Sequence, residues 1–293
     1  KSEDKILADI AVTLGLYESP KAAERALMFD VDEKLDNGLR YILVENDSPD
    51  RMIEMRLIFR AGSVLETEEN RGAAHFLEHK LFDLPGRDVS AEFAAMGAMV
   101  NAYTSYDLTA YYFSCTENFH ECLKLLLEFV STPYLTKESV EKEQGIIGQE
   151  IGMNTDNPDT RIFEDLMLAV YENHPIRNPT LGTVEAIAKI TPQVLETAHK
   201  AFYRPENMLL CVVGDVDEES VCRIAEETLP DTQPVQVERK NQFPEEMSCQ
   251  KSLTECKMDV AMPTFQLGFK CEAPQYGEAG VRQEMVADLA AEM

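Results

Sequence analysis

Basic residues are scarce in this chain of 293 residues. Lys and Arg number 27 against 53 Asp and Glu, which leaves a formal net charge of −26. A field of that sign repels phosphate backbones and anionic lipid headgroups, so the composition argues against nucleic acid as a partner. The same field concentrates cationic peptides near an acidic cavity, although a charge of this size is also typical of a plain soluble acidic surface.

Long apolar runs and paired cysteines are missing as well. No apolar stretch reaches the roughly 18 residues that cross a bilayer, so no membrane span is predicted. The N-terminal stretch lacks a secretory apolar region because Asp4, Asp9 and Glu18 interrupt it. The seven cysteines are odd in number and form no C-x-x-C pair, which is typical of reduced thiols in a reducing compartment. We therefore expect a cytoplasmic protein.

The chain nevertheless holds enough apolar sequence for a substantial core. Hydrophobic residues make up 44% of it, and its length exceeds what one core usually fills. We expect a helical N-terminal extension of unknown role at 1–27, a main domain at 28–229 and a linker rich in Pro, Gln and Glu at 230–247. Residues 248–293 are too few for an independent core, so they read as the beginning of an incomplete second domain.

Strand and helix patterns occur in blocks, which favours an α+β fold with an antiparallel sheet flanked by helices over a βαβ repeat. Period-two alternation predicts a strand at 53–59, β-rich composition predicts strands within 28–44 and 99–115, and a short continuous apolar run predicts one at 209–213. Two more strands are expected beyond 248. Apolar stripes and capping residues predict helices at 71–82, 89–96, 119–130, 136–153, 162–171, 184–190, 192–203 and 218–228, and from 280 onward.

The clearest chemical pattern is the segment His75–His79, which reads H-F-L-E-H. On a helix, His75 and His79 lie one turn apart, so both imidazoles can reach one metal ion from the same face. Glu78 lies at the edge of that face, where its carboxylate can accept a proton from a water molecule without itself binding the metal. The alternative is a surface helix with two unrelated histidines, but the apolar neighbours of both predict a partly buried helix.

A zinc site with an open position needs a third protein ligand. The best donors lie on the later helix, where Glu143, Ile147 and Glu150 fall at i, i+4 and i+7 on one stripe. Two carboxylates on a partly apolar stripe favour a cationic neighbour. In a chain this acidic, however, such a pair is also typical of a solvated helix face.

The H-x-x-E-H segment, preceded by Arg71-Gly72-Ala73-Ala74, resembles the active-site helix of the insulinase-like (pitrilysin) zinc peptidases. This family includes the mitochondrial processing peptidase and its bacterial relatives. The resemblance implies one Zn²⁺ per chain, held by His75, His79 and Glu150, with Glu143 supporting those ligands from a second shell. It extends over about 28–228, including 35–39, 101–105, 181–183 and 207–216. Most members carry a hydrophobic residue at the position of Lys80. In having lysine there, the chain is similar to a bacterial subgroup of processing-peptidase-like proteins.

The resemblance also implies how a substrate is held. Family members join α+β domains into two halves around a chamber, where an unfolded peptide adds as a strand to a sheet edge. On that basis Asn101 is expected to contact the peptide substrate. A hairpin stabilised by cross-strand aromatic and threonine pairs explains the same segment without any substrate.

One family feature is absent from this sequence. Active members use an arginine and a tyrosine, seven residues apart in the second half, to stabilise the tetrahedral intermediate. Arg282 is the only arginine near the C-terminus, and no tyrosine follows it at that spacing. A homologous second subunit or a missing C-terminal half is therefore the expected partner. The sequence predicts a zinc-dependent endopeptidase for unfolded peptides, with a non-catalytic peptide-binding subunit and a purely structural zinc site as alternatives.

Overall fold

The computed structural model describes residues 33–45, 51–229, 243–272 and 278–292. The predicted extension at 1–27 lies outside the described residues, as do residues 28–32 of the first predicted strand region and most of the predicted linker. Among the described residues, no helix combines the length and the apolar character that crossing a bilayer requires.

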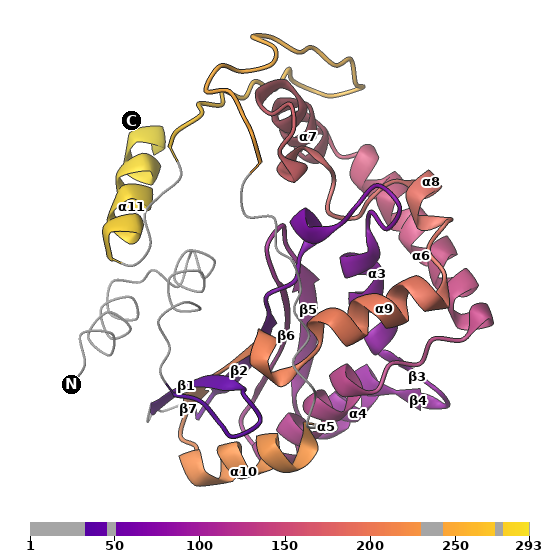
Figure 1. Ribbon diagram of the computed structural model, residues 1–293, viewed down its shortest axis with the longest axis vertical. Coiled ribbons are helices and arrows are strands. Elements are labelled where there is room, and N and C mark those ends of the chain that lie inside the picture. Colours follow the sequence, from indigo (N-terminus) through magenta and orange to yellow (C-terminus); the bar gives the residue numbers. More distant parts are fainter. Residues whose placement is uncertain (1–32, 46–50, 230–242, 273–277, 293) are drawn as a thin grey trace.

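A five-stranded sheet organises the fold (Figure 1). Its order is β1-β7-β2-β6-β5, so β5 forms one edge. The strands are β1 (Arg40–Glu45), β2 (Ile53–Phe59), β5 (Met99–Thr104), β6 (Thr109–Cys115) and β7 (Met208–Gly214). The α+β class predicted from the sequence is confirmed. Three of the four pairings are antiparallel, whereas β1 and β7 run parallel, a pairing that strand patterns alone could not reveal.

The sheet buries the two faces of its strands in different cores. On β2, Met55, Leu57 and Phe59 join the large core under the helices, while Ile58 joins a smaller cluster on the opposite face. This division follows from the alternation of side chains along a strand. The large core therefore fixes the side of the sheet on which the helices pack.

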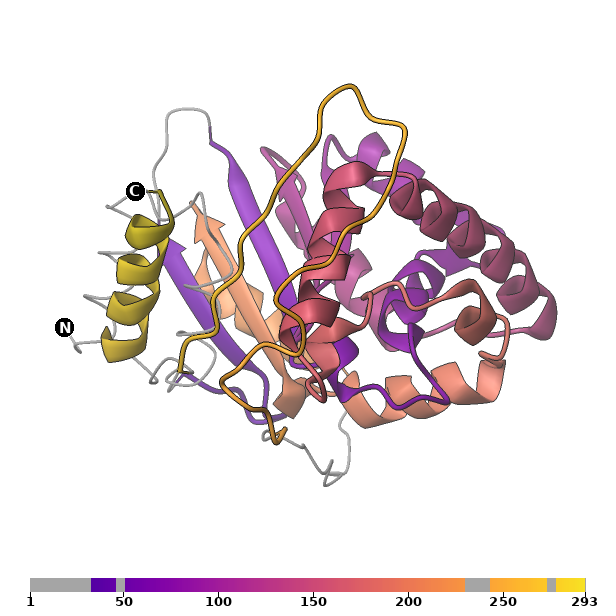
Figure 2. The ribbon, with the colours of Figure 1, turned by 90° about the horizontal axis from the view of Figure 1, so that it is seen from above.

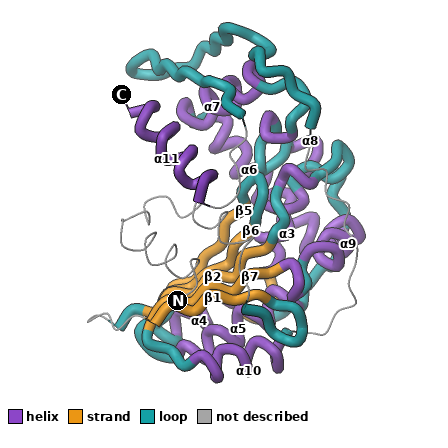
Figure 3. The backbone as a smooth tube through the Cα atoms, turned by 60° about the vertical axis from the view of Figure 1, so that its left-hand side comes forward, coloured by secondary structure: helices purple, strands orange, loops and turns teal. Residues whose placement is uncertain are grey.

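Helices cover the face of the large core. Figure 3 shows α4, α5 and α10 grouped near one end of the strands, and α3, α6 and α9 grouped beside β5 and β6. The helices of the main part of the chain span Ala73–Leu81 (α3), Val89–Ala95 (α4), Phe119–Ser131 (α5), Lys137–Thr155 (α6), Pro158–Val170 (α7), Val184–Ile187 (α8), Pro192–Phe202 (α9) and Glu218–Thr228 (α10).

Helix boundaries follow the capping residues. The side chains of Thr136, Asn157 and Thr191 accept hydrogen bonds from backbone N–H groups in the first turns of α6, α7 and α9. These bonds satisfy N–H groups that have no partner within the helix. A short hairpin of β3 (Asp83–Leu84) and β4 (Arg87–Asp88) follows α3, and the sequence patterns did not predict it.

The segment 243–272 crosses the surface without forming a strand, so the two strands expected beyond 248 are wrong for the described residues. A strand needs a paired neighbour to satisfy its backbone, and this segment has none. Glu245 holds it near α7 by accepting from the backbone N–H of Glu172 at 3.2 Å and from Lys270 Nζ at 3.1 Å. Helix α11 (Glu278–Glu292) follows and stands apart from the helices that cover the sheet (Figure 2).

Two kinds of glycine around the α3–α6 pair predict opposite responses to substitution. Gly145 and Gly152 lie on exposed turns of α6, with no atom within 4 Å of an added Cβ. Gly145→Ala and Gly152→Ala should each stabilise the protein by about 1 kcal/mol, because alanine favours the helix.

Gly72 has φ +89°, and its added Cβ would lie 2.6 Å from Ile187 Cδ1. Gly72→Ala should therefore destabilise by at least about 1 kcal/mol. Urea titration measures all three, and a destabilising Gly145→Ala would contradict the helix argument.

Candidate metal centre

Two helices that lie far apart in the sequence bring three metal-binding side chains together. His75 and His79 project from α3, and Glu150 projects from α6. One ligand atom from each lies within 4.8 Å of the others. Glu150 Oε2 lies 3.7 Å from His75 Nε2 and 3.4 Å from His79 Nε2. The three residues expected as ligands are thus neighbours in space.

The packing of each helix explains this geometry. On α3, Phe76, Leu77 and Leu81 are buried in the large core, so the helix cannot rotate without exposing them. On α6, Ile147 is fully buried in the same core. Because the ligand positions are set relative to these anchors by the helical period, core packing places the imidazoles of α3 opposite the carboxylates of α6.

Glu143 contacts the centre through His79. Its Oε1 lies 3.0 Å from His79 Nδ1, and its side chain is largely buried. This contact leaves His79 Nε2 directed at Glu150. A carboxylate that bonds the far nitrogen of a histidine sets the tautomer and ring orientation that metal binding requires.

The electrostatics of the cluster differ between its two histidines. Burial, followed by the nearby His79, lowers the pKa of His75 to about 3, so His75 is neutral and can donate its lone pair to a metal. Burial also lowers the pKa of His79, but the hydrogen bond that His79 donates to Glu143 and the charges of Glu78 and Glu150 outweigh it and raise that pKa. Three carboxylates around two imidazoles thus favour a positive charge in this space.

The donor set fits a divalent ion such as zinc. Zinc binds imidazole nitrogen and carboxylate oxygen at about 2.0–2.2 Å, so ligand atoms at tetrahedral positions stand roughly 3.3–3.6 Å apart. Of the two separations between Glu150 and the histidines, 3.4 Å lies within that range and 3.7 Å lies just above it. Three protein ligands leave one position open, which is typical of a catalytic rather than a closed structural site.

Glu78 is held by a residue that the sequence analysis missed. Thr104 Oγ1 donates a hydrogen bond to Glu78 Oε2 at 2.5 Å. Burial raises the pKa of Glu78, as does the charge of Glu150, while the Thr104 hydrogen bond acts in the opposite sense. Thr104 ends the edge strand β5, 26 residues from Glu78, so only the packing of α3 beside β5 could identify it.

Asn101 lies on the edge strand β5 and is exposed. It pairs with Tyr112 of β6, and its Oδ1 accepts from the neighbouring Ala102 N–H at 2.8 Å. No other strand pairs with β5, so its outer edge is open in the part of the chain that the structure describes. The expected substrate contact of Asn101 stays a prediction.

Comparison with known families agrees with this arrangement. Residues 41–184 match the family described as Insulinase (Peptidase family M16), and residues 189–292 match the Peptidase M16 inactive domain. The chain belongs to the insulinase family. The three residues of the candidate metal cluster, together with Glu78 and Glu143, lie within the first of these matches.

Individual relatives extend the insulinase assignment. The chain is 41% identical over 222 residues to "Uncharacterized zinc protease YmfH" of Bacillus subtilis (strain 168), which covers 74% of this chain and 52% of the relative. It is 32% identical over 197 residues to the mitochondrial-processing peptidase subunit beta of Caenorhabditis elegans, which covers 66% of this chain and 43% of that protein. The chain spans about half the length of these relatives.

A solved structure shares the insulinase fold. The crystal structure of an M16-like peptidase from Alicyclobacillus acidocaldarius superposes with a TM-score of 0.70 at 39% identity. The match covers 75% of this chain and 54% of that one. The sheet and its helical layer are therefore shared with the insulinase family.

The Glu143–His79 contact yields a test of metal binding. Glu143→Gln should weaken zinc binding about 10- to 100-fold, because the amide no longer draws the imidazole Nδ1 proton as a carboxylate does. Competition against a chromophoric chelator measures the affinity. Glu141→Gln is the matched control, since Glu141 is exposed on the same helix and contacts only Lys137 among the ion pairs of the described residues, at 3.7 Å. Equal affinity of both variants would contradict a supporting role for Glu143.

Proposed function

We propose that this chain carries the metal half of a zinc-dependent endopeptidase that hydrolyses unfolded peptides. The observation that supports it most is the convergence of His75, His79 and Glu150, with the carboxylate of Glu78 on the same helix face. The names of its relatives as zinc proteases point the same way. The proposal assigns one zinc ion to this cluster.

Zinc, when bound in such a site, lowers the pKa of a water molecule toward neutrality and polarises a peptide carbonyl. Glu78 accepts a proton from the attacking water as the oxygen bonds to the carbonyl carbon. It then passes that proton to the amine as the C–N bond breaks. Thr104 orients the Glu78 carboxylate, and burial keeps its pKa raised, which suits a group that must both accept and release a proton.

The open edge of β5 supports a mode of substrate binding. An extended peptide can add to this edge as a further strand, with backbone hydrogen bonds supplying affinity and little demand on side chains. Asn101, exposed on β5, is our choice for a polar contact. The net charge of −26 favours cationic peptides among possible substrates.

A second half is part of the proposal. The chain spans about half the length of its relatives, and it offers no arginine–tyrosine pair of the kind that active insulinase members use. We infer that a homologous subunit or C-terminal half supplies those groups across the chamber. Peptide cleavage is therefore to be measured on this chain both alone and together with such a half.

A non-catalytic, peptide-binding subunit is the second candidate. Residues 189–292 match a domain described as inactive, which favours this reading for that part of the chain. The metal cluster and Glu78, however, lie within 41–184, and non-catalytic members of such families tend to lose their ligand set. The two candidates differ in whether the zinc-loaded protein cleaves.

Glu78→Gln tests the proposed chemistry. The variant should bind zinc with the affinity of the unaltered chain but cleave a quenched, unstructured peptide about 10²- to 10⁴-fold more slowly, because the amide cannot accept the proton. Zinc content is measured by atomic emission and cleavage by fluorescence, each with and without chelator.

Glu121→Gln, on an exposed position of α5, is the control for removal of one negative charge. Undiminished turnover in Glu78→Gln would exclude Glu78 as the base. Stoichiometric zinc without cleavage, with or without a second half, would favour the non-catalytic subunit. A protein that binds no zinc would refute the proposed endopeptidase.

A further inference from the structure

Helix α3 begins without a capping side chain of its own. Its N-cap residue is Gly72, and its first turn contains no acidic residue. The first four N–H groups of a helix have no partner within it and need one from elsewhere. The source of these partners is important here because His75 is the third residue of α3.

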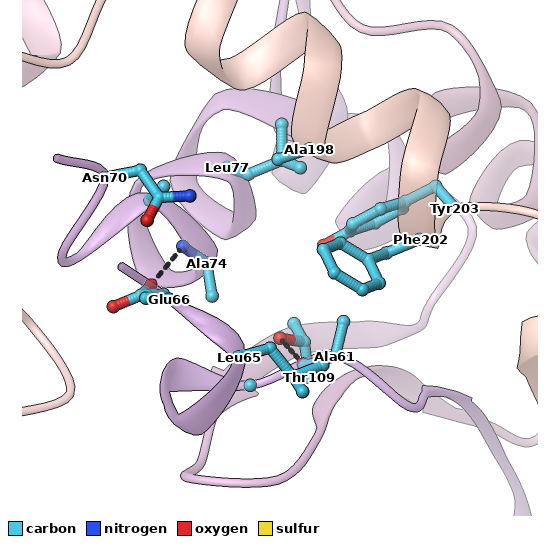
Figure 4. A pocket seen from close by; sticks show the side chains of 12 residues that line it. Ala61, Leu65, Glu66, Asn70, Ala74, Leu77, Thr109, Ala198, Phe202 and Tyr203 are labelled. Atoms are coloured by element: carbon cyan, nitrogen blue, oxygen red, sulfur yellow. Dashed lines mark hydrogen bonds between the residues drawn. The ribbon is translucent and has the colours of Figure 1, made fainter. Parts of the chain in front are cut away.

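Glu66, six residues before the N-cap, supplies two of the missing partners. Its Oε2 accepts from the backbone N–H of Gly72 at 2.7 Å, and its Oε1 accepts from that of Ala74 at 2.8 Å. The Asn70 carbonyl accepts from the Ala73 N–H at 3.0 Å. Figure 4 shows the Glu66 carboxylate aimed at the start of α3, with its bond to Ala74 drawn.

The position of Glu66 is costly for a carboxylate unless these bonds hold it. Its side chain lines a small pocket between α3 and α9, among Ala74, Leu77, Ala198 and Phe202 (Figure 4). Burial raises its pKa to about 7, although both backbone bonds and the charge of Arg71 act in the opposite sense. A negative group at a helix N-terminus is also stabilised by the helix dipole. Both carboxylate oxygens therefore serve the first turn of α3.

We propose that Glu66 is a positioning residue of the metal centre: by capping α3 from outside, it holds the first helical turn closed and thereby holds His75 in place. This inference rests on the proposed function, because the cap on α3 can affect catalysis only if His75 binds a metal ion.

The length of α3 makes the cap important. The helix has nine residues, and helices of that length are marginal by themselves. Its first intrahelical hydrogen bond is donated by the Phe76 N–H to the Gly72 carbonyl at 2.9 Å. The helical turn that this bond closes contains His75. If the first turn opens, His75 loses its fixed direction, whereas His79 lies one turn further on and keeps its bond to Glu143. A ligand set needs its donors within about 0.5 Å of their working positions.

Glu66→Gln is the test variant, because it keeps the shape of the side chain but replaces one acceptor oxygen by an amide that repels an N–H. Glu69→Gln is the matched control, since Glu69 is exposed on the same loop. Hydrogen exchange is measured on the metal-free chain, and zinc affinity by competition with a chromophoric chelator. For Glu66→Gln we expect exchange in residues 72–76 to quicken about tenfold, with β2 and β6 unchanged, and zinc affinity to fall at least about tenfold.

Two results would overturn the proposal. One is exchange and zinc affinity in Glu66→Gln within about twofold of the control. The other is an equal loss of protection in α3 and in the sheet, which would make Glu66 a general stabilising residue. If Glu66→Gln does not fold, Glu66→Asp, which keeps the charge but shortens its reach, is judged by the same criteria. Should the unaltered chain bind no zinc, the proposed function fails, while exchange in the metal-free chain still decides the role of Glu66.

Discussion

The packing of α3 against α6 is the constraint on which the centre depends. Neither helix holds a complete ligand set, because α3 carries two imidazoles and α6 carries the carboxylates. Their relative rotation is fixed by apolar side chains, Phe76 and Leu77 on one and Ile147 on the other, which share the large core. A rotation that separated Glu150 from the histidines would expose these core residues to water, at a cost of about 1.5–3 kcal/mol for each large side chain. The hydrophobic core therefore determines how the side chains of Glu150 and the two histidines lie relative to one another.

The same packing gathers more negative charge than the two histidines can balance. Glu78, Glu143 and Glu150 surround His75 and His79, and the charge of Glu150 adds to burial in raising the pKa of Glu78. Such a cluster favours a cation, because carboxylates in a partly desolvated space repel one another. The two histidines differ in role. His75 is neutral and deeply buried, whereas His79 is tied to Glu143, so the site combines an uncharged donor with an oriented one.

Local patterns predicted the elements well wherever a helix or strand owes its limits to its own residues. Thr136 and Thr191 begin their helices as expected, since a cap acts over three residues. Asn157 was expected only to end the helix before it, yet it caps α7, which begins at Pro158 rather than near residue 162. Contacts between distant elements were not predictable in the same way. The parallel β1–β7 pair, the Thr104–Glu78 bond and the Glu66 cap of α3 depend on which elements lie side by side. The strands expected beyond 248 fail in the described residues for a related reason, because strand propensity without a neighbour leaves the backbone unpaired.

The sequence by itself determined the chemistry available: the H-x-x-E-H spacing on a helix, the stripe of Glu143 and Glu150 one helix later, and the acidic balance of the chain. It could do so because the helical period converts spacing into a shared face. Helical spacing alone did not distinguish Glu143 from Glu150, and only the family resemblance named Glu150 as a ligand and Glu143 as its support. The tertiary structure places Glu150 beside both histidines and Glu143 at His79 Nδ1, and it alone identified Glu66 as the cap of α3. Those assignments depend on distances between helices and loops set by core packing, and core packing is a property of the whole domain rather than of any segment.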